Sequence, residues 1–170
     1  MALVLAATVI AVPAPAAARA SPSTWRWPLD GHPRVIRRFA PPPEPWLAGH
    51  RGVDLAAPPG APVLAAGAGT VRFAGPVGGR GVVTVEHTSG LRTTYVPVTS
   101  SLTQGQSIAQ GAKLGVLESP TDHCQEPCLH WGLLRGTRYL DPLLLLGQAP
   151  IRLLPFWQAS PEHLPPHSAP

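Results

Sequence analysis

Residues 82 to 96 read V-V-T-V-E-H-T-S-G-L-R-T-T-Y-V, and this stretch decides the fold class. Two runs rich in β-branched residues, 82–87 and 91–96, flank the short segment Thr88-Ser89-Gly90. Two such runs around a short turn that contains glycine are typical of an antiparallel β-hairpin. We interpret His87, at the end of the first run, as a residue that caps the turn.

Further short runs with strand character lie on both sides of the hairpin. They are residues 35–39, 62–65, 69–73, 113–118 and 129–134. Strand follows strand without helices between them, which predicts an all-β chain with one antiparallel sheet or two packed sheets. A single helical turn is expected at 143–146, because Pro142 suits the first position of a helix.

Composition supports this fold class. The 170 residues include 17 glycines and 23 prolines, 40 in all, and both residue types interrupt helices. The hydrophobic content of 44% is too high for a disordered chain. The net charge of +4 is small and scattered, which argues against a nucleic-acid partner.

The two ends differ from the body of the chain. Residues 2–12 are apolar, and Ala18-Arg19-Ala20 forms an A-x-A cleavage site, so residues 1–20 are interpreted as a secretory signal peptide. The basic segment that usually precedes such an apolar run is missing, which leaves a buried N-terminal helix or strand as the alternative. Residues 25–147 are expected to form the folded domain, and 148–170 a proline-rich tail. We expect a bacterial protein that is secreted or associated with the cell envelope, with no membrane span after processing.

Three side chains have the residue types and spacing of a metal site. His50 and Asp54 lie four residues apart, and Gly49 and Gly52 allow the tight turn that would let them converge. Cys128 and His130 are two residues apart in an expected strand, so they face the same side. His50, Asp54 and His130 would leave a fourth position open on zinc. Alternatively, His50 caps a turn, Asp54 accepts loop N–H bonds and His130 is a packed strand residue.

Several motifs in order resemble the LytM/lysostaphin-type zinc metallopeptidases. The matching stretches are Trp27-Pro28-Leu29-Asp30-Gly31, residues 49–55, 59–63 and 65–71, the hairpin ending at Tyr95, residues 110–115, and Leu129-His130-Trp131-Gly132. The resemblance covers residues 25–146. It implies an antiparallel two-sheet core of the duplicated hybrid-motif type and one Zn²⁺ bound by His50, Asp54 and His130. The family's substrates would be peptidoglycan peptides.

Two positions depart from that family. Its second motif is H-x-H, but Cys128 stands at the first position, and Pro97 stands two residues after Tyr95 where the family has histidine. Both assisting histidines are therefore absent, although general acid–base help is typically worth about 10²–10⁴-fold in rate. His123 is a candidate replacement base, with a solvated loop histidine as the alternative reading.

Cys128 has three possible states. A disulfide with Cys124 is favoured, because the chain is expected to be exported. A free thiol would be a poor base, and a thiolate would close the zinc site as a structural one.

Three functions follow from these alternatives. The first is a peptidoglycan metalloendopeptidase. The second is a catalytically degenerate module that binds cell wall or activates a separate cell-wall hydrolase. The third is a purely structural zinc site.

Overall fold

The computed structural model describes residues 24–44, 46–119 and 124–148. The proposed signal peptide at 1–20, His123 and residues 149–170 of the expected tail lie outside the described residues. In the described part, no helix is long and apolar enough to cross a membrane.

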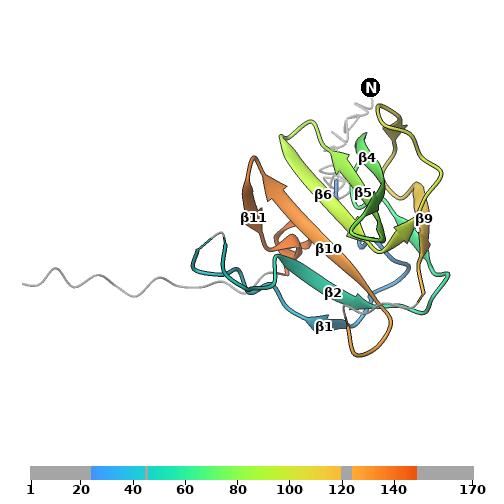
Figure 1. Ribbon diagram of the computed structural model, residues 1–170. Coiled ribbons are helices and arrows are strands. Elements are labelled where there is room, and N and C mark those ends of the chain that lie inside the picture. Colours follow the sequence, from blue (N-terminus) through green and yellow to red (C-terminus); the bar gives the residue numbers. More distant parts are fainter. Residues whose placement is uncertain (1–23, 45, 120–123, 149–170) are drawn as a thin grey trace, which may run out of the picture.

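The described residues form β-strands and one short 3₁₀ helix, η1, which confirms the all-β prediction (Figure 1). The elements are β1 (Val35–Arg37), β2 (Gly52–Ala56), β3 (Pro62–Leu64), β4 (Gly69–Val77), β5 (Arg80–Glu86), β6 (Leu91–Val96), β7 (Val98–Thr99), β8 (Ser107–Ile108), β9 (Lys113–Leu117), β10 (Cys128–Arg135), β11 (Arg138–Leu140) and η1 (Pro142–Leu146).

Two antiparallel sheets make up the fold, so the two-sheet alternative is the observed one. The larger sheet has the order β1-β2-β10-β6-β5-β4-β8, with β11 added alongside β10, and the smaller has the order β3-β9-β7. Figure 1 shows β10 in the middle of the larger sheet, between β2 and β6. The predicted hairpin is β5 and β6, which pair from Glu86 opposite Arg92 to Val83 opposite Tyr95.

The core lies beneath the strands that carry the candidate metal ligands. Val53 and Leu55 of β2 and Leu129 and Trp131 of β10 are fully buried. Successive residues of a strand point to opposite faces. The neighbours of these core residues, Asp54 and His130, therefore face the other side of the same sheet.

Several boundaries differ from the sequence expectation. The first strand ends at Arg37 instead of residue 39, and its register with β2 shifts between Val35 and Arg37. β4 continues to Val77 beyond the expected 69–73. The helical turn after Asp141 is present as η1, and the Asp141 carboxylate accepts a hydrogen bond from the Leu143 amide at 3.0 Å.

Candidate metal centre

His50 is held in place by the chain that follows β1. Its backbone forms a two-bond bridge with Ala40, at 2.8 and 3.0 Å. Its ring Nδ1 lies 2.7 Å from the Arg38 carbonyl oxygen. A carbonyl oxygen only accepts, so Nδ1 carries the proton and donates it. With that proton on Nδ1, a neutral ring would present Nε2 as a lone-pair donor toward β2 and β10.

Asp54 and His130 are brought together by strand register. They are directly opposite each other in the antiparallel pairing of β2 with β10, so their side chains share a face. The His130 Nδ1 atom lies 2.7 Å from Asp54 Oδ1. His50 is 2% exposed, Asp54 1% and His130 19%, so the group is buried but reachable past His130.

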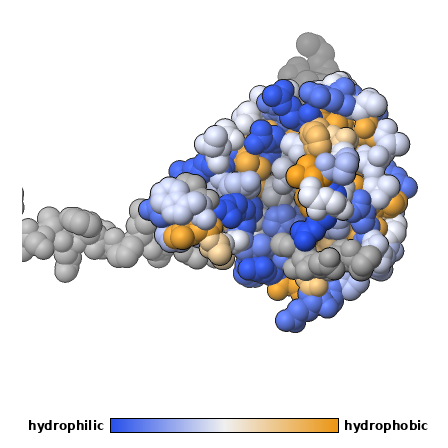
Figure 2. Space-filling model, in the orientation of Figure 1, coloured by the Kyte–Doolittle hydropathy of each residue, from blue (hydrophilic) through white to orange (hydrophobic). Residues whose placement is uncertain are grey.

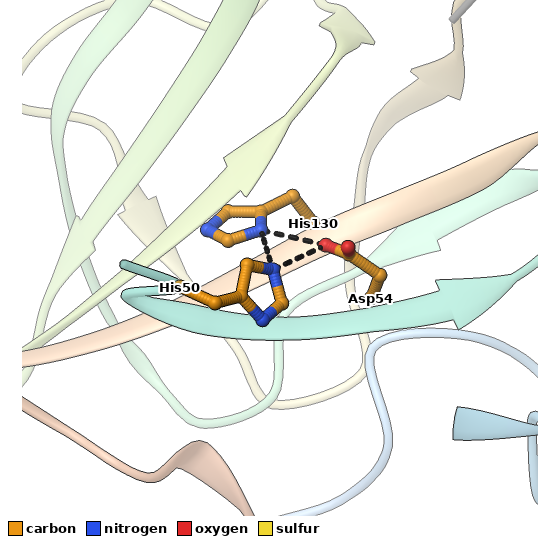
Figure 3. A group of neighbouring side chains, drawn as sticks. All are labelled: His50, Asp54 and His130. Carbon is orange, nitrogen blue, oxygen red and sulfur yellow. Dashed lines mark hydrogen bonds and ion pairs between the residues drawn. The ribbon is translucent and has the colours of Figure 1, made fainter. Parts of the chain in front are cut away.

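The three ligand atoms form a small triangle, shown in Figure 3. His50 Nε2 lies 3.0 Å from Asp54 Oδ1 and 3.2 Å from His130 Nδ1. With the carboxylate ionised and both rings neutral, one proton at most, on His130 Nδ1, is available for the three contacts. Buried polar atoms that lack enough protons to hydrogen-bond one another are costly, and a cation removes that cost.

The donor set fits a zinc ion. Two imidazole nitrogens and a carboxylate oxygen are the ligand types of catalytic zinc sites, which keep a further position open. Around a tetrahedral zinc with bonds of about 2.1 Å, ligand atoms lie roughly 3.4 Å apart. The observed separations of 2.7–3.2 Å need only a small outward movement to reach that spacing.

Gly52 has a different role from the one the sequence suggested. We expected Gly49 and Gly52 to permit a tight turn by conformational freedom, but neither has a positive φ. A Cβ atom at Gly52 would overlap the Trp131 carbonyl oxygen and lie 2.7 Å from His130 Nε2. Glycine is therefore needed here because the Trp131 carbonyl and the His130 ring both approach the β2 backbone closely.

The remaining sequence candidates lie around this triangle. Cys128 is fully buried and forms a disulfide with Cys124, with the two Cα atoms 6.2 Å apart. A disulfide sulfur carries no proton and is not a thiolate ligand, so the alternative of a closed site with Cys128 on the metal is not the observed arrangement. Pro97 is buried at the end of β6, and its carbonyl accepts the Glu118 amide at 3.2 Å.

His87 does not cap the hairpin turn with its side chain, as we had interpreted it. The ring is 5% exposed; Nδ1 donates to the Ala68 carbonyl at 2.8 Å, and Nε2 lies 2.8 Å from Thr93 Oγ1. The Thr93 hydroxyl in turn lies 2.9 Å from the Tyr95 hydroxyl. Burial lowers the pKa of His87, and the hydrogen bond to Ala68 opposes that shift. Sequence reasoning missed this network, because it depends on contacts between β5, β6 and the loop before β4.

Comparisons with known proteins agree with the geometry. Residues 48–142 match the model of peptidase family M23. An uncharacterized protein of Mycobacterium tuberculosis is 46% identical over 145 residues, which cover 82% of this chain and 58% of that protein. The peptidoglycan DD-endopeptidase ShyA of Vibrio cholerae is 32% identical over 116 residues, 64% of this chain and 26% of that one. The chain thus spans little more than half of the first relative and about a quarter of the second.

The fold of this chain is also similar to that of a solved structure. The crystal structure of a zinc-containing peptidase from Vibrio cholerae matches with a TM-score of 0.60 and 28% identity, over 70% of this chain and 39% of that one. The segment that matches the family model, residues 48–142, begins just before His50 and ends just after β11, so it includes all three residues of the triangle. This chain is a member of peptidase family M23, the LytM/lysostaphin class of metallopeptidases.

Proposed function

We propose that this chain is an exported zinc metalloendopeptidase that hydrolyses peptide bonds in bacterial peptidoglycan. The observation that carries the proposal is the triangle of His50 Nε2, Asp54 Oδ1 and His130 Nδ1, in which two imidazole nitrogens and a carboxylate oxygen lie within 3.2 Å of one another. The substrate class is supported by the similarity to ShyA, which is named a peptidoglycan DD-endopeptidase. Zinc is supported by the similarity to a zinc-containing peptidase.

The roles of the residues follow from their contacts. His50, Asp54 and His130 would hold the ion, and the Arg38 carbonyl orients the His50 ring so that Nε2 faces it. Zinc supplies Lewis-acid chemistry, which polarises a carbonyl group and makes water acidic enough to act near neutral pH. The 19% exposure of His130 leaves a side through which a peptide can approach.

The proposed chain organisation has three parts. Residues 1–20 are a signal peptide that directs export, 25–147 form the peptidase domain, and 148–170 are a proline-rich tail. N-terminal sequencing of the exported protein should find Ser21 as the first residue. A mature protein that still begins within residues 2–12 would contradict the signal-peptide assignment.

A second function is favoured by two specific residues. Neither Pro97 nor the disulfide-bonded Cys128 can give or take a proton at the positions that we associated with assisting histidines. His123 stays a proposed replacement base. If nothing replaces the missing groups, the chain would be a degenerate module that binds cell wall or activates a separate hydrolase.

One experiment separates the two functions. The full chain and its His130→Ala variant are loaded with zinc, their metal content is measured, and each is incubated with purified sacculi. Mass spectrometry then detects released muropeptides, and sedimentation detects wall binding. Release by the wild type alone supports the endopeptidase. Zinc-loaded protein that sediments with sacculi and releases nothing would replace it with the wall-binding module.

A further inference from the structure

A pocket opens beside the triangle formed by His50, Asp54 and His130. Its volume is about 400 Å³, within the usual range for ligand sites. The residues that line it are Ile36, Arg37, Asp54, Cys124, Gln125 and Glu126. Figure 2 shows the face above β2 and β10 hollowed in its middle, with hydrophilic residues gathered in the hollow. Because Asp54 belongs to both the pocket and the triangle, a peptide at the metal would extend into this pocket.

Arg37 lies in line with the candidate ligands. Arg37 of β1 is opposite Asp54 of β2, which is in turn opposite His130 of β10. Residues directly opposite each other in antiparallel strands share a face. Neighbouring strands are about 4.8 Å apart, so the Arg37 backbone lies roughly 10 Å from that of His130. At that separation, a peptide bound at the proposed reaction centre could place a neighbouring group next to the Arg37 side chain.

The charge of Arg37 is available for a ligand. The side chain is exposed, and within 24–44, 46–119 and 124–148 no hydrogen bond or ion pair involves its guanidinium. Among the described residues, the two carboxylates that line the pocket, Asp54 and Glu126, are already engaged. Asp54 contacts the two histidines, and the Glu126 oxygens lie 2.8 and 2.7 Å from Nη2 of Arg34. In the described part of the chain, the pocket therefore presents a cation that its lining acids do not neutralise.

We propose that Arg37 is a specificity-determining residue that binds a carboxylate group of the peptide, next to the bond at the metal. The inference rests on the proposed function, since it concerns the peptide that this site acts on. A guanidinium pairs with a carboxylate through two parallel N–H bonds, a geometry that lysine does not reproduce. The ligand class is thus a peptide with a free side-chain or terminal carboxylate close to the scissile bond.

The test uses two synthetic cell-wall stem peptides that are identical except that every carboxylate of one is a carboxamide in the other. Binding is measured by calorimetry with the wild type, Arg37→Gln and Arg37→Lys. Arg72→Gln is the matched control, because Arg72 is exposed on β4, far along the sheet from β1. We expect the wild type and Arg72→Gln to bind the carboxylate peptide about tenfold more tightly than the amide.

In Arg37→Gln that preference should disappear through weaker binding of the carboxylate peptide alone, and Arg37→Lys should restore only part of it. Equal affinities for the two peptides in the wild type, a preference retained by Arg37→Gln, or no binding of either peptide would overturn the inference.

Cleavage of the same peptides is measured separately. Cleavage without any carboxylate preference would leave the proposed function standing and remove the role of Arg37. The opposite result is a binding preference that Arg37→Gln loses, with no cleavage by zinc-loaded protein. It would support the role of Arg37 and contradict the proposed peptidase function.

Discussion

The described residues contain two largely buried histidine clusters, which lie on opposite faces of the larger sheet. His50, Asp54 and His130 are on one face, whereas His87, Thr93 and Tyr95 are on the other, where Tyr95 is opposite Trp131. The first cluster joins residues up to 80 positions apart, whereas the second lies within residues 87–95, and both are largely buried. They differ in how many protons they contain for the contacts they make.

In the His87 cluster every contact has a proton. The Ala66 amide donates to the Tyr95 oxygen at 3.0 Å, and the Tyr95 hydroxyl donates to Thr93. The Thr93 hydroxyl donates to His87 Nε2, because His87 Nδ1 already donates to the Ala68 carbonyl. The chain of donors is complete with a neutral imidazole. Burial raises the pKa of Tyr95 to about 12, which keeps its hydroxyl proton in place.

The cluster of His50, Asp54 and His130 has no such chain of hydrogen-bond donors. His50 Nδ1 also donates to a carbonyl, but Nε2 then faces a carboxylate oxygen and a second imidazole. The comparison teaches that burial alone does not identify a functional histidine. A cluster with a proton for each contact stabilises the fold by itself, whereas a cluster with too few protons supports the cation site that we propose.

The largest expected effect is on zinc binding. His130→Ala removes one of three proposed ligands, so zinc affinity should fall by more than the roughly 10–100-fold that loss of an outer partner costs. The measurement is zinc content by mass spectrometry and affinity by competition with a chelator. Pro97→Ala is the control and should retain wild-type affinity. Equal zinc retention by the wild type and His130→Ala would refute the ligand assignment.

The next effect concerns the complete cluster. Tyr95→Phe leaves the buried Ala66 amide without an acceptor and Thr93 without a donor. The free energy of unfolding should fall by about 1–3 kcal/mol, measured by urea denaturation. Zinc affinity should stay as in the wild type. A variant that loses zinc while it stays folded would show that the two clusters are not independent.

The smallest effect is a pH dependence that comes from His87. Its pKa is lowered in the folded state by burial, so below about pH 6.5 the unfolded state binds more protons than the folded one. Stability from this residue is therefore complete above that pH and declines as the pH falls toward the folded pKa, by at most about 1.4 kcal/mol per pH unit.

Urea denaturation of zinc-free protein between pH 8 and pH 5 measures this slope. The wild type should lose stability more steeply than His87→Asn. Exposed His32→Asn is the matched control and should follow the wild type. An unchanged slope in His87→Asn would mean that the folded state protonates this ring as readily as the unfolded chain does.

Local patterns predicted much of the fold. The β5–β6 hairpin follows from two β-branched runs around a glycine turn, and η1 follows from Asp141-Pro142, because both depend on residues adjacent in the chain. The common face of Cys128 and His130 follows from strand alternation. The family's motifs placed His50, Asp54 and His130 in one group, which the geometry also brings together.

Other features could not be predicted from local patterns. The position of Arg37 opposite Asp54 depends on an irregular register between β1 and β2, and no short-range pattern encodes that register. Gly52 was expected to act through backbone freedom, but what matters there is the close approach of His130, a residue 78 positions further along the chain. His87 was expected to cap the hairpin turn, but its side-chain partners Ala68 and Thr93 come from different segments.

The sequence by itself determined the hairpin, most of the longer strands and the three residue types that suit a metal, but not the strand β2 that carries Asp54. Tertiary structure decided which histidine cluster has too few protons for its contacts and which cation faces the pocket beside it. The physical reason is range. Strand and turn preferences act between neighbours in the chain, whereas the protonation of a buried ring and the pairing of a charge depend on atoms that only the register of distant strands brings within about 3 Å.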